Sequence, residues 1–192
     1  MNWWKKLKGK VRFLEPLAKH TTFKIGGPAE FFIEPEDITD LKLLLNLVKR
    51  YKIPVFLIGG GSNILINDKG IRGAVLHLNS PYFKRFIFKN NRLEAGSGVM
   101  LSRMVLKTYK RGLSGVEFLS GIPGTLGGAL VMNAGAWGRN IGDLVEEVNV
   151  MDYNGNIKSL GKKKIKFGYR QSSLEKFIIL SACLKLTKKS KE

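Results

Sequence analysis

The sequence lacks the features that mark secreted and disulfide-rich proteins. Its 192 residues contain one cysteine, Cys183, which excludes internal disulfides and fits a reducing compartment. The N-terminus places lysines after its two tryptophans and has no apolar stretch of about 7 to 15 residues. We therefore expect no secretory signal, and we predict a cytoplasmic protein.

No segment has the composition of a membrane span. Residues 118–138 carry no charge, and a span needs about 20 apolar residues. This run, however, contains Pro123, Thr125, Asn133 and six glycines, whose backbone and side-chain polar groups would be poorly satisfied in lipid. We expect no membrane partner.

Acidic residues are scarce. The chain has 15 of them against 33 lysines and arginines, a formal net charge of +18, which favours anionic partners. Residues 158–192 hold ten lysines and one arginine against two glutamates, but aromatic residues do not alternate with these lysines as they do in single-strand binders. We expect no nucleic acid partner. The lysine-rich segment is either a solvated face or a surface that another domain or an anionic substrate covers.

The hydrophobic pattern predicts an α+β fold in two lobes. Residues 20–35 alternate like a hairpin with a turn at Gly26, Gly27 and Pro28, and Asp37 precedes a helical pattern over residues 38–51. Further strands are predicted at 55–59, 64–68, 74–78, 145–153, 156–160 and 177–186, a hairpin around Asn90 and Asn91, and a helix at 100–110. The expected division is an N-terminal lobe (1–80), a second lobe (81–186) and a basic tail (187–192).

The segment GGGSN at residues 59–63 follows an apolar strand. Consecutive glycines allow a tight turn and bring successive N–H groups close to an oxyanion. A P-loop is excluded because no lysine follows at the required spacing, and a dinucleotide fingerprint is excluded because Ile64 and the residues after it are expected in a strand. A diphosphate nest and an ordinary tight turn both remain open.

A second glycine-rich segment, GIPGTLGGALVMNAGA, occupies residues 121–136. Its Gly-Ile-Pro-Gly start predicts a rigid turn that delivers Thr125 to the beginning of a short helix. Gly127, Gly128 and Ala129 then form a surface without side-chain bulk, on which a flat ring or a phosphate can lie. Close packing of a helix on a strand explains the glycines equally well, but not Thr125 or Asn133.

Four segments, in this order, carry a resemblance to a known family. They read HTTFKIGGPAEFF, LIGGGSNILINDKGIRGAVLHL, GVEFLSGIPGTLGGALVMNAGAWG and FGYRQSSL. Over about residues 15 to 186 the chain resembles the FAD-binding part of the UDP-N-acetylenolpyruvoylglucosamine reductases, the MurB family. The resemblance implies a two-lobed α+β domain of the vanillyl-alcohol oxidase (PCMH) type. It also implies an enzyme that uses NADPH to reduce the enolpyruvyl UDP-sugar in peptidoglycan synthesis.

The resemblance further implies which residues bind FAD, without a covalent link. Gly59, Gly60, Gly61, Ser62 and Asn63 would line the diphosphate, and the flavin would lie along Gly121, Ile122, Gly124, Thr125, Gly127, Gly128, Asn133, Ala134 and Gly135. His20, His77 and Cys183, the candidate linkage residues, lie outside these loops. No metal site is expected.

Arg170 matches the catalytic arginine of the family. Hydride delivery to an enolpyruvyl ether pushes charge onto the substrate carboxylate, and a guanidinium fork would stabilise that charge through two parallel hydrogen bonds. Tyr169 is a neighbouring candidate for substrate binding, with a purely structural role as the alternative.

The chain also departs from the family, whose members continue into a third, substrate-binding domain that supplies a serine proton donor. Two interpretations follow. The chain is either a truncated or split reductase that needs this C-terminal domain, or an FAD-binding module without full reductase activity.

Overall fold

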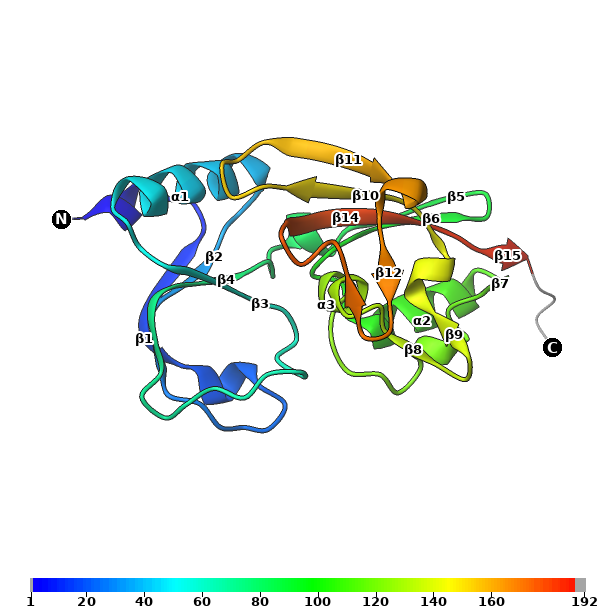
Figure 1. Ribbon diagram of the computed structural model, residues 1–192, viewed down its shortest axis with the longest axis horizontal. Helices are drawn as coiled ribbons and strands as arrows, with labels where there is room; N and C mark the ends of the chain where they lie inside the picture. Colours follow the sequence, from blue (N-terminus) through cyan, green and yellow to red (C-terminus); the bar gives the residue numbers. More distant parts are fainter. Residues whose placement is uncertain (1, 189–192) are drawn as a thin grey trace. The chain divides into compact units, whose positions relative to one another are not determined.

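The computed structural model describes residues 2–188. The chain forms two compact units. Unit 1 comprises the residues up to Tyr82 together with Tyr153–Gly155, and unit 2 comprises Phe83–Asp152 and the residues from Asn156 onward. Each unit combines one larger sheet with helices (Figure 1). No helix among the described residues is long and apolar enough to cross a membrane.

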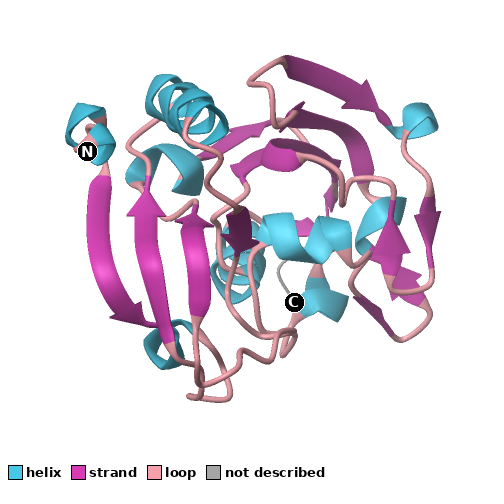
Figure 2. Cartoon of the chain, turned by 60° about the vertical axis from the view of Figure 1, so that its left-hand side comes forward, coloured by secondary structure: helices cyan, strands magenta, loops and turns pink. Residues whose placement is uncertain are grey.

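Unit 1 is built on a four-stranded sheet of order β1-β2-β4-β3. Its strands are β1 (Lys10–Pro16), β2 (Pro28–Glu34), β3 (Val55–Ile58) and β4 (Ile71–His77). β1 is antiparallel to β2, whereas β4 is parallel to both of its neighbours. β1 is therefore one of the two edge strands of this sheet, the one beside the N-terminal turn in Figure 2. A parallel core with one antiparallel edge strand results.

Helix α1 (Ile38–Arg50) forms where the sequence predicts it. The Asp37 side chain accepts hydrogen bonds from the backbone amides of Thr39 and Asp40 at 2.8 and 2.9 Å, a side-chain N-cap. The apolar positions spaced three and four apart are buried: Leu41, Leu44, Leu45 and Val48. Burial of this stripe fixes the helix on its unit.

The predicted hairpin over residues 20–35 is wrong in its first strand. The antiparallel partner of β2 is β1, and the short 3-10 helix η2 (Leu17–His20) lies between them. The amides of Leu17 and Ala18 donate to the carbonyls of Gly27 and Gly26 at 3.1 Å. Gly27 lies close to the turn at Asp68, because a Cβ added to Gly27 would lie 1.9 Å from the carbonyl oxygen of Asp68. The glycines therefore serve a close approach between segments rather than a tight hairpin turn.

Residues 64–68, expected as a strand, form no strand. Their alternation has another cause: Ile66 is buried in a core cluster with Leu17, Phe32 and Val75, and Ile64 packs against the same cluster. Apolar side chains thus fill the core from an irregular segment.

Unit 2 contains a five-stranded antiparallel sheet of order β11-β10-β14-β6-β5. Its strands are β5 (Phe86–Lys89), β6 (Arg92–Gly96), β10 (Val145–Met151), β11 (Ile157–Gly161) and β14 (Ile178–Lys185). Helices α2 (Leu101–Lys110) and α3 (Leu126–Val131) contribute to one apolar core with this sheet. The hairpin around Asn90 and Asn91 and the helix at 100–110 are confirmed, and so is the α+β class.

Short elements complete the fold. Three strand pairs lie in unit 2: β7 (Leu113–Ser114) with β15 (Thr187–Lys188), β8 (Gly135–Ala136) with β9 (Arg139–Asn140), and β12 (Phe167–Gly168) with β13 (Gln171–Ser172). The remaining 3-10 helices are η1 (Trp3–Lys6), η3 (Pro81–Lys84), η4 (Glu117–Leu119), η5 (Ile141–Asp143) and η6 (Lys162–Lys164). The first two residues of the predicted basic tail form β15, and its residues 189–192 lie outside the described residues.

Candidate functional site

The first glycine loop, residues 59–63, leaves the carboxyl end of β3 in unit 1. Gly61 has a φ of +62°, and a Cβ there would lie 1.9 Å from the backbone oxygen of His20. The amide of Thr22 donates to the Gly61 carbonyl at 3.0 Å. Close packing against residues 20–22 therefore requires glycine at this position.

The amides of this loop are available to a ligand. Within residues 2–188, those of Gly60, Gly61 and Asn63 donate no hydrogen bond to the protein. Buried and half-buried backbone donors are normally paired, and adjacent unpaired N–H groups form the kind of concavity that binds anions. The loop thus combines a structural role with unpaired amides, and phosphate binding at these amides stays a prediction.

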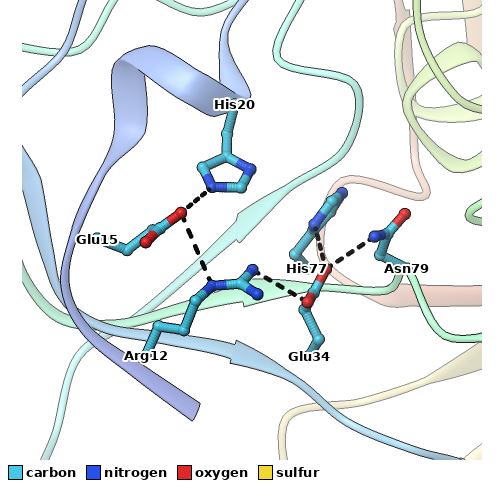
Figure 3. A network of polar contacts seen from close by, with 6 residues as sticks. All are labelled: Arg12, Glu15, His20, Glu34, His77 and Asn79. Carbon is cyan, nitrogen blue, oxygen red and sulfur yellow. Dashed lines mark hydrogen bonds and ion pairs between the residues drawn. The ribbon is translucent and has the colours of Figure 1, made fainter. Parts of the chain in front are cut away.

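A polar network in unit 1 supports the segment on which this loop packs (Figure 3). The His20 ring stacks on Phe32 with centroids 4.1 Å apart, and its Nε2 lies 2.9 Å from Glu15 Oε1. Glu34 accepts hydrogen bonds from Arg12 Nη2 at 3.0 Å and Asn79 Nδ2 at 2.8 Å. Figure 3 shows Arg12 between the two carboxylates, which links both halves of the network. His20 is thereby held by its ring while its carbonyl contacts Gly61.

Glu34 is the most buried charge of this network, with 9% of its surface exposed. Burial raises the pKa of Glu34, but the hydrogen bond from Asn79 and the charges of Arg12 and His77 outweigh it, so that the pKa lies below its ordinary value of 4.5. A carboxyl with a depressed pKa in the folded state stabilises the fold above its unfolded pKa. This contribution is lost as the pH falls through the folded pKa.

We therefore expect Glu34→Gln to lower the free energy of unfolding at pH 7 by roughly 1–2 kcal/mol, since Arg12 is partly exposed and its charge partly screened. The difference between variant and wild type should shrink below pH 4.5. Urea unfolding at several pH values measures both. Glu36→Gln, which changes an exposed carboxylate of the same unit, is the control. A difference that stays constant down to pH 3 would contradict the assignment.

The second glycine-rich segment begins with the predicted turn and short helix. Thr125 caps α3 of unit 2, and its Oγ1 accepts from the Gly128 amide at 3.4 Å. The Gly124 carbonyl accepts from the Leu101 amide at 3.0 Å. The Thr125 hydroxyl, which packing alone does not explain, therefore has a role within the protein as an N-cap.

The glycines of this segment differ in their surroundings. The Gly127 amide donates to the Ser97 carbonyl at 2.9 Å, and a Cβ on Gly127 would lie 3.1 Å from the Ser97 Cβ, so close packing explains this glycine. A Cβ on Gly128 would meet only the Thr125 hydroxyl, at 3.7 Å, and one on Gly121 would meet nothing within 4 Å. The surface without side-chain bulk thus belongs to Gly121 and Gly128.

Ser97 is a candidate ligand residue that sequence reasoning missed. It is 5% exposed, and its Oγ has no hydrogen-bond partner within the part of the chain that the structure describes. A buried hydroxyl without a partner is costly and indicates an absent water or ligand. The signal was present in the sequence: Ser97 follows β6 between two glycines, as Ser62 follows β3 after glycines. This orphan hydroxyl and the open glycines fit a polar, flat ligand.

Asn133 connects two loops of unit 2. Its Oδ1 accepts from the Gly142 amide at 3.1 Å, and its Nδ2 donates to the Gly168 carbonyl at 3.0 Å. Its φ of 44° is a conformation that asparagine tolerates better than most residues. Both ends of the amide are thus engaged within the protein, and the second glycine segment is brought together with the β12–β13 hairpin.

The other predicted residues of this segment have structural contacts. Ile122 and Ala134 pack against the core of unit 2. A Cβ on Gly135 would lie 2.3 Å from the Arg139 carbonyl oxygen, because β8 pairs with β9 at this point. Ile122 and Ala134 are half-buried, whereas Gly135 is exposed.

Tyr169 and Arg170 form the two-residue loop of the β12–β13 hairpin. Tyr169 is 89% exposed, and the Arg170 guanidinium lies 5.9 Å from the centre of the Tyr169 ring. Among residues 2–188, the Arg170 side chain makes no hydrogen bond or ion pair. The N–H groups of the Arg170 guanidinium are therefore free to donate two parallel hydrogen bonds to one carboxylate.

Removing the Asn133 bridge should loosen the hairpin. Asn133→Ala leaves the Gly142 amide and the Gly168 carbonyl without partners, at a cost of about 1–3 kcal/mol, and hydrogen exchange of residues 167–172 should accelerate. Exchange measured by mass spectrometry tests this. Asn46→Ala, on the exposed face of α1, should leave exchange in the hairpin unchanged, and equal protection in both variants would show that Asn133 does not hold the hairpin.

A comparison with protein families decides the general class. The model of the FAD binding domain matches residues 29–161, well over half of the chain. The chain belongs to the FAD binding domain family. FAD as the predicted cofactor is thereby confirmed at the level of the family, and the donors described above fit a diphosphate and a flat ring.

Two curated relatives of this FAD binding domain carry the same name. The chain is 47% identical over 178 residues to the UDP-N-acetylenolpyruvoylglucosamine reductase of Clostridioides difficile (strain 630), covering 92% of the chain and 58% of the relative. It is 38% identical over 187 residues to that of Bacillus subtilis (strain 168), covering 96% and 61%. The resemblance that the four motifs predicted is confirmed. The chain spans about three fifths of the length of these relatives.

Solved structures confirm the fold class of the FAD binding domain. The MurB reductase of Thermus caldophilus superposes with a TM-score of 0.80 at 30% identity, covering 96% of this chain and 64% of that one. The 6-hydroxy-D-nicotine oxidase of Arthrobacter nicotinovorans superposes with a TM-score of 0.75 at 16% identity, covering 95% and 43%. The second likeness shows the fold alone.

Proposed function

We propose that the chain is the FAD-holding part of a UDP-N-acetylenolpyruvoylglucosamine reductase. The reaction would be the NADPH-dependent reduction of UDP-N-acetylglucosamine enolpyruvate to UDP-N-acetylmuramate, a cytoplasmic step of peptidoglycan precursor synthesis. The observation that carries this proposal is the free guanidinium of Arg170 on a two-residue hairpin loop, in a chain 47% identical to a reductase of that name.

In unit 1 the diphosphate of FAD would be held by Gly59, Gly60, Gly61, Ser62 and Asn63. The free amides of Gly60, Gly61 and Asn63 support this assignment. The neutral donors of such a loop stabilise an anion without a lysine, because several N–H dipoles point to one place.

In unit 2 the ring system would lie along Gly121, Ile122, Gly124, Thr125, Gly127, Gly128, Asn133, Ala134 and Gly135. The open surfaces of Gly121 and Gly128 and the unpaired hydroxyl of Ser97 support this part. Since the side chains of Thr125 and Asn133 bind within the protein, these residues would contact the ring through backbone and would position the segment.

FAD would be bound without a covalent link and would, when bound, accept and deliver hydride. The histidines are engaged elsewhere, with the His20 ring against Glu15 and the His77 Nδ1 3.1 Å from Glu34 Oε1. Cys183 lies 3.7 Å from a Glu146 oxygen, and burial raises its thiol pKa, so that it is a poor nucleophile.

Arg170 would bind the substrate carboxylate through two parallel hydrogen bonds. As hydride reaches the methylene carbon, negative charge would develop on the adjacent carbon and spread onto the carboxylate oxygens, where the guanidinium would stabilise it most in the transition state. The adjacent carbon would then take a proton from the serine that the family resemblance assigns to the C-terminal domain. Tyr169 would contribute its exposed ring to substrate binding beside this fork.

Substrate-dependent NADPH oxidation tests this function. The purified chain is expected to take up added FAD and turn yellow. Supplied with the C-terminal part of the Clostridioides difficile relative, it should oxidise NADPH only when the enolpyruvyl substrate is present. A colourless protein that binds no FAD would rule out both flavin functions.

A second candidate function is an FAD-binding module without reductase activity. It is favoured by the unpaired amides of the first glycine loop and the unpaired Ser97 hydroxyl within residues 2–188, which suit FAD and do not require a substrate. FAD binding without substrate-dependent NADPH oxidation, even with the C-terminal part supplied, would decide for this candidate.

A further inference from the structure

We propose that the N-terminal edge of unit 1 binds the surface of an anionic lipid bilayer. This membrane-binding surface consists of Trp4, Phe13 and Leu14 together with Lys5, Lys6, Lys8 and Lys10. It lies outside the residues proposed for FAD and substrate. It also departs from the sequence-based expectation of no membrane partner, which rested on the lack of an apolar span.

Two consecutive apolar residues are exposed on this edge. Phe13 is 50% exposed and Leu14 is 68% exposed, although an alternating strand would bury one of the two. The pairing of β1 with β2 runs from Phe13–Phe31 directly to Glu15–Ala29, with no partner for Leu14. Leu14 has a φ of 50°, outside the strand region. This irregularity in an edge strand leaves both side chains accessible to a partner.

The aromatic residues form a rigid base for this surface. Trp4 contacts Phe13 edge-on at a centroid distance of 5.1 Å, and Phe13 contacts Phe31 at 5.6 Å. Trp3 is buried against Phe31. The amides of Lys8 and Gly9 donate to the Asp40 carboxylate at 2.9 and 2.8 Å. The surface is thus ordered before binding, which lowers the entropic cost of association.

The charge of this segment has one sign. Residues 2–14 contain five cationic residues and no acidic one. Arg12 is engaged by Glu34, but Lys5, Lys6, Lys8 and Lys10 are exposed. A lysine near an anionic bilayer strengthens binding by about 1 kcal/mol, a factor of about five. Exposed lysines beside Phe, Leu and Trp are the composition of interfacial membrane-binding segments.

Other partners fit this surface less well. Single-stranded nucleic acid needs open aromatic faces for stacking, but the rings here pack edge-on against one another, and Leu14 cannot stack on a base. A second copy of the chain pairing through β1 would bring the same lysines together, and like charges oppose such contact.

Flotation with lipid vesicles tests the proposal on the full chain at about 0.1 M salt, where the screening length is about 10 Å. Wild type is expected to float with vesicles of phosphatidylcholine and phosphatidylglycerol but not with phosphatidylcholine alone. Because the chain carries a net charge of +18, the decisive comparison is between variants of equal charge.

Two double variants test the role of charge. The first carries Lys5→Glu and Lys6→Glu in the proposed surface. The second, its control, carries Lys162→Glu and Lys163→Glu, which replace exposed lysines in η6 of unit 2. The first should lower the partition coefficient at least tenfold, and the second less than twofold. Equal losses would overturn the proposal, because they would show that net charge alone drives binding.

Two single variants test the apolar contribution: Leu14→Asn in the proposed surface, and Trp137→Asn as its control. Both residues are exposed with φ values of 50° and 57°, a region in which asparagine is tolerated, so neither variant should lose its fold. Only Leu14→Asn should weaken flotation, by about threefold to tenfold for removing one apolar side chain from the interface. Unchanged flotation of Leu14→Asn would overturn the proposal. Two other results would also overturn it, provided that flotation persists in Leu14→Asn. One is that this variant loses binding to an oligonucleotide, measured by fluorescence anisotropy, and the other is that it loses a dimer, measured by gel filtration.

Discussion

Replacing Arg170 by alanine is expected to lower substrate-dependent NADPH oxidation by about 10²–10³-fold, the loss typical for removing one donor that stabilises a developing oxyanion. The protein should keep its FAD, since Arg170 lies outside the two glycine segments proposed for the cofactor and its guanidinium makes no hydrogen bond or ion pair within residues 2–188 that the substitution would remove. The backbone should be unaffected, because arginine and alanine are similarly strained at a φ of 53°. The assay supplies the C-terminal part of a curated relative.

Arg170→Lys separates charge from geometry. Lysine retains the positive charge but lacks the planar fork, so activity should lie between those of wild type and Arg170→Ala. Arg50→Ala, at the exposed end of α1, is the matched control and should keep full activity. If Arg170→Ala instead loses FAD, the residue belongs to the cofactor site and its proposed role is wrong.

Gly61→Ala is expected to have the largest effect among substitutions in the glycine loops. A left-handed conformation costs an L-residue about 1–2 kcal/mol, and the added Cβ would also lie 1.9 Å from the His20 carbonyl oxygen. The loop must therefore move away from residues 20–22. We expect a fall of several degrees in the melting temperature and a loss of FAD affinity of at least tenfold.

Two other glycines separate these contributions. Gly138 has a φ of +73° and nothing within 4 Å of an added Cβ, so Gly138→Ala measures backbone strain alone. Gly161 has an ordinary backbone conformation and is equally open, so Gly161→Ala should be nearly silent. Thermal melting should give the order Gly61, Gly138, Gly161 from largest to smallest loss. A Gly61→Ala protein as stable as Gly138→Ala would show that the contact with His20 is easily relieved.

Local patterns predicted the helices well. The Asp37 cap, the three-and-four spacing of leucines in α1 and the apolar stripe of α2 are properties of consecutive residues, and the structure has both helices within a residue of expectation. The hairpin around Asn90 and Asn91 is predicted for the same reason, since Asn90 takes the left-handed φ that its turn needs.

Contacts between distant segments could not be read from the sequence. Gly27 approaches Asp68, and Ile66 fills a core next to Leu17, so that a glycine pair resembled a hairpin turn and an irregular segment resembled a strand. The sequence pattern does not predict β1, because its alternation breaks at Leu14.

The site residues stay a prediction, and the structure adds what surrounds each of them. Glycine spacing identified both loops, but only packing distances separate Gly127, which contacts Ser97, from Gly128, which is open. Asn133 is predicted beside the ring, and the structure adds that its side-chain amide bridges Gly142 and Gly168. A side chain that satisfies two backbone groups far apart in sequence leaves no local pattern.

The Asn133 bridge makes the two loops of unit 2 thermodynamically coupled. A ligand that orders the segment around Asn133 also orders the hairpin that carries Arg170, and by linkage each ligand raises the affinity for the other by the same factor. Under the proposed function, FAD should therefore tighten binding of a carboxylate at Arg170, and that carboxylate should slow release of FAD. In this view a single asparagine makes cofactor and substrate binding cooperative.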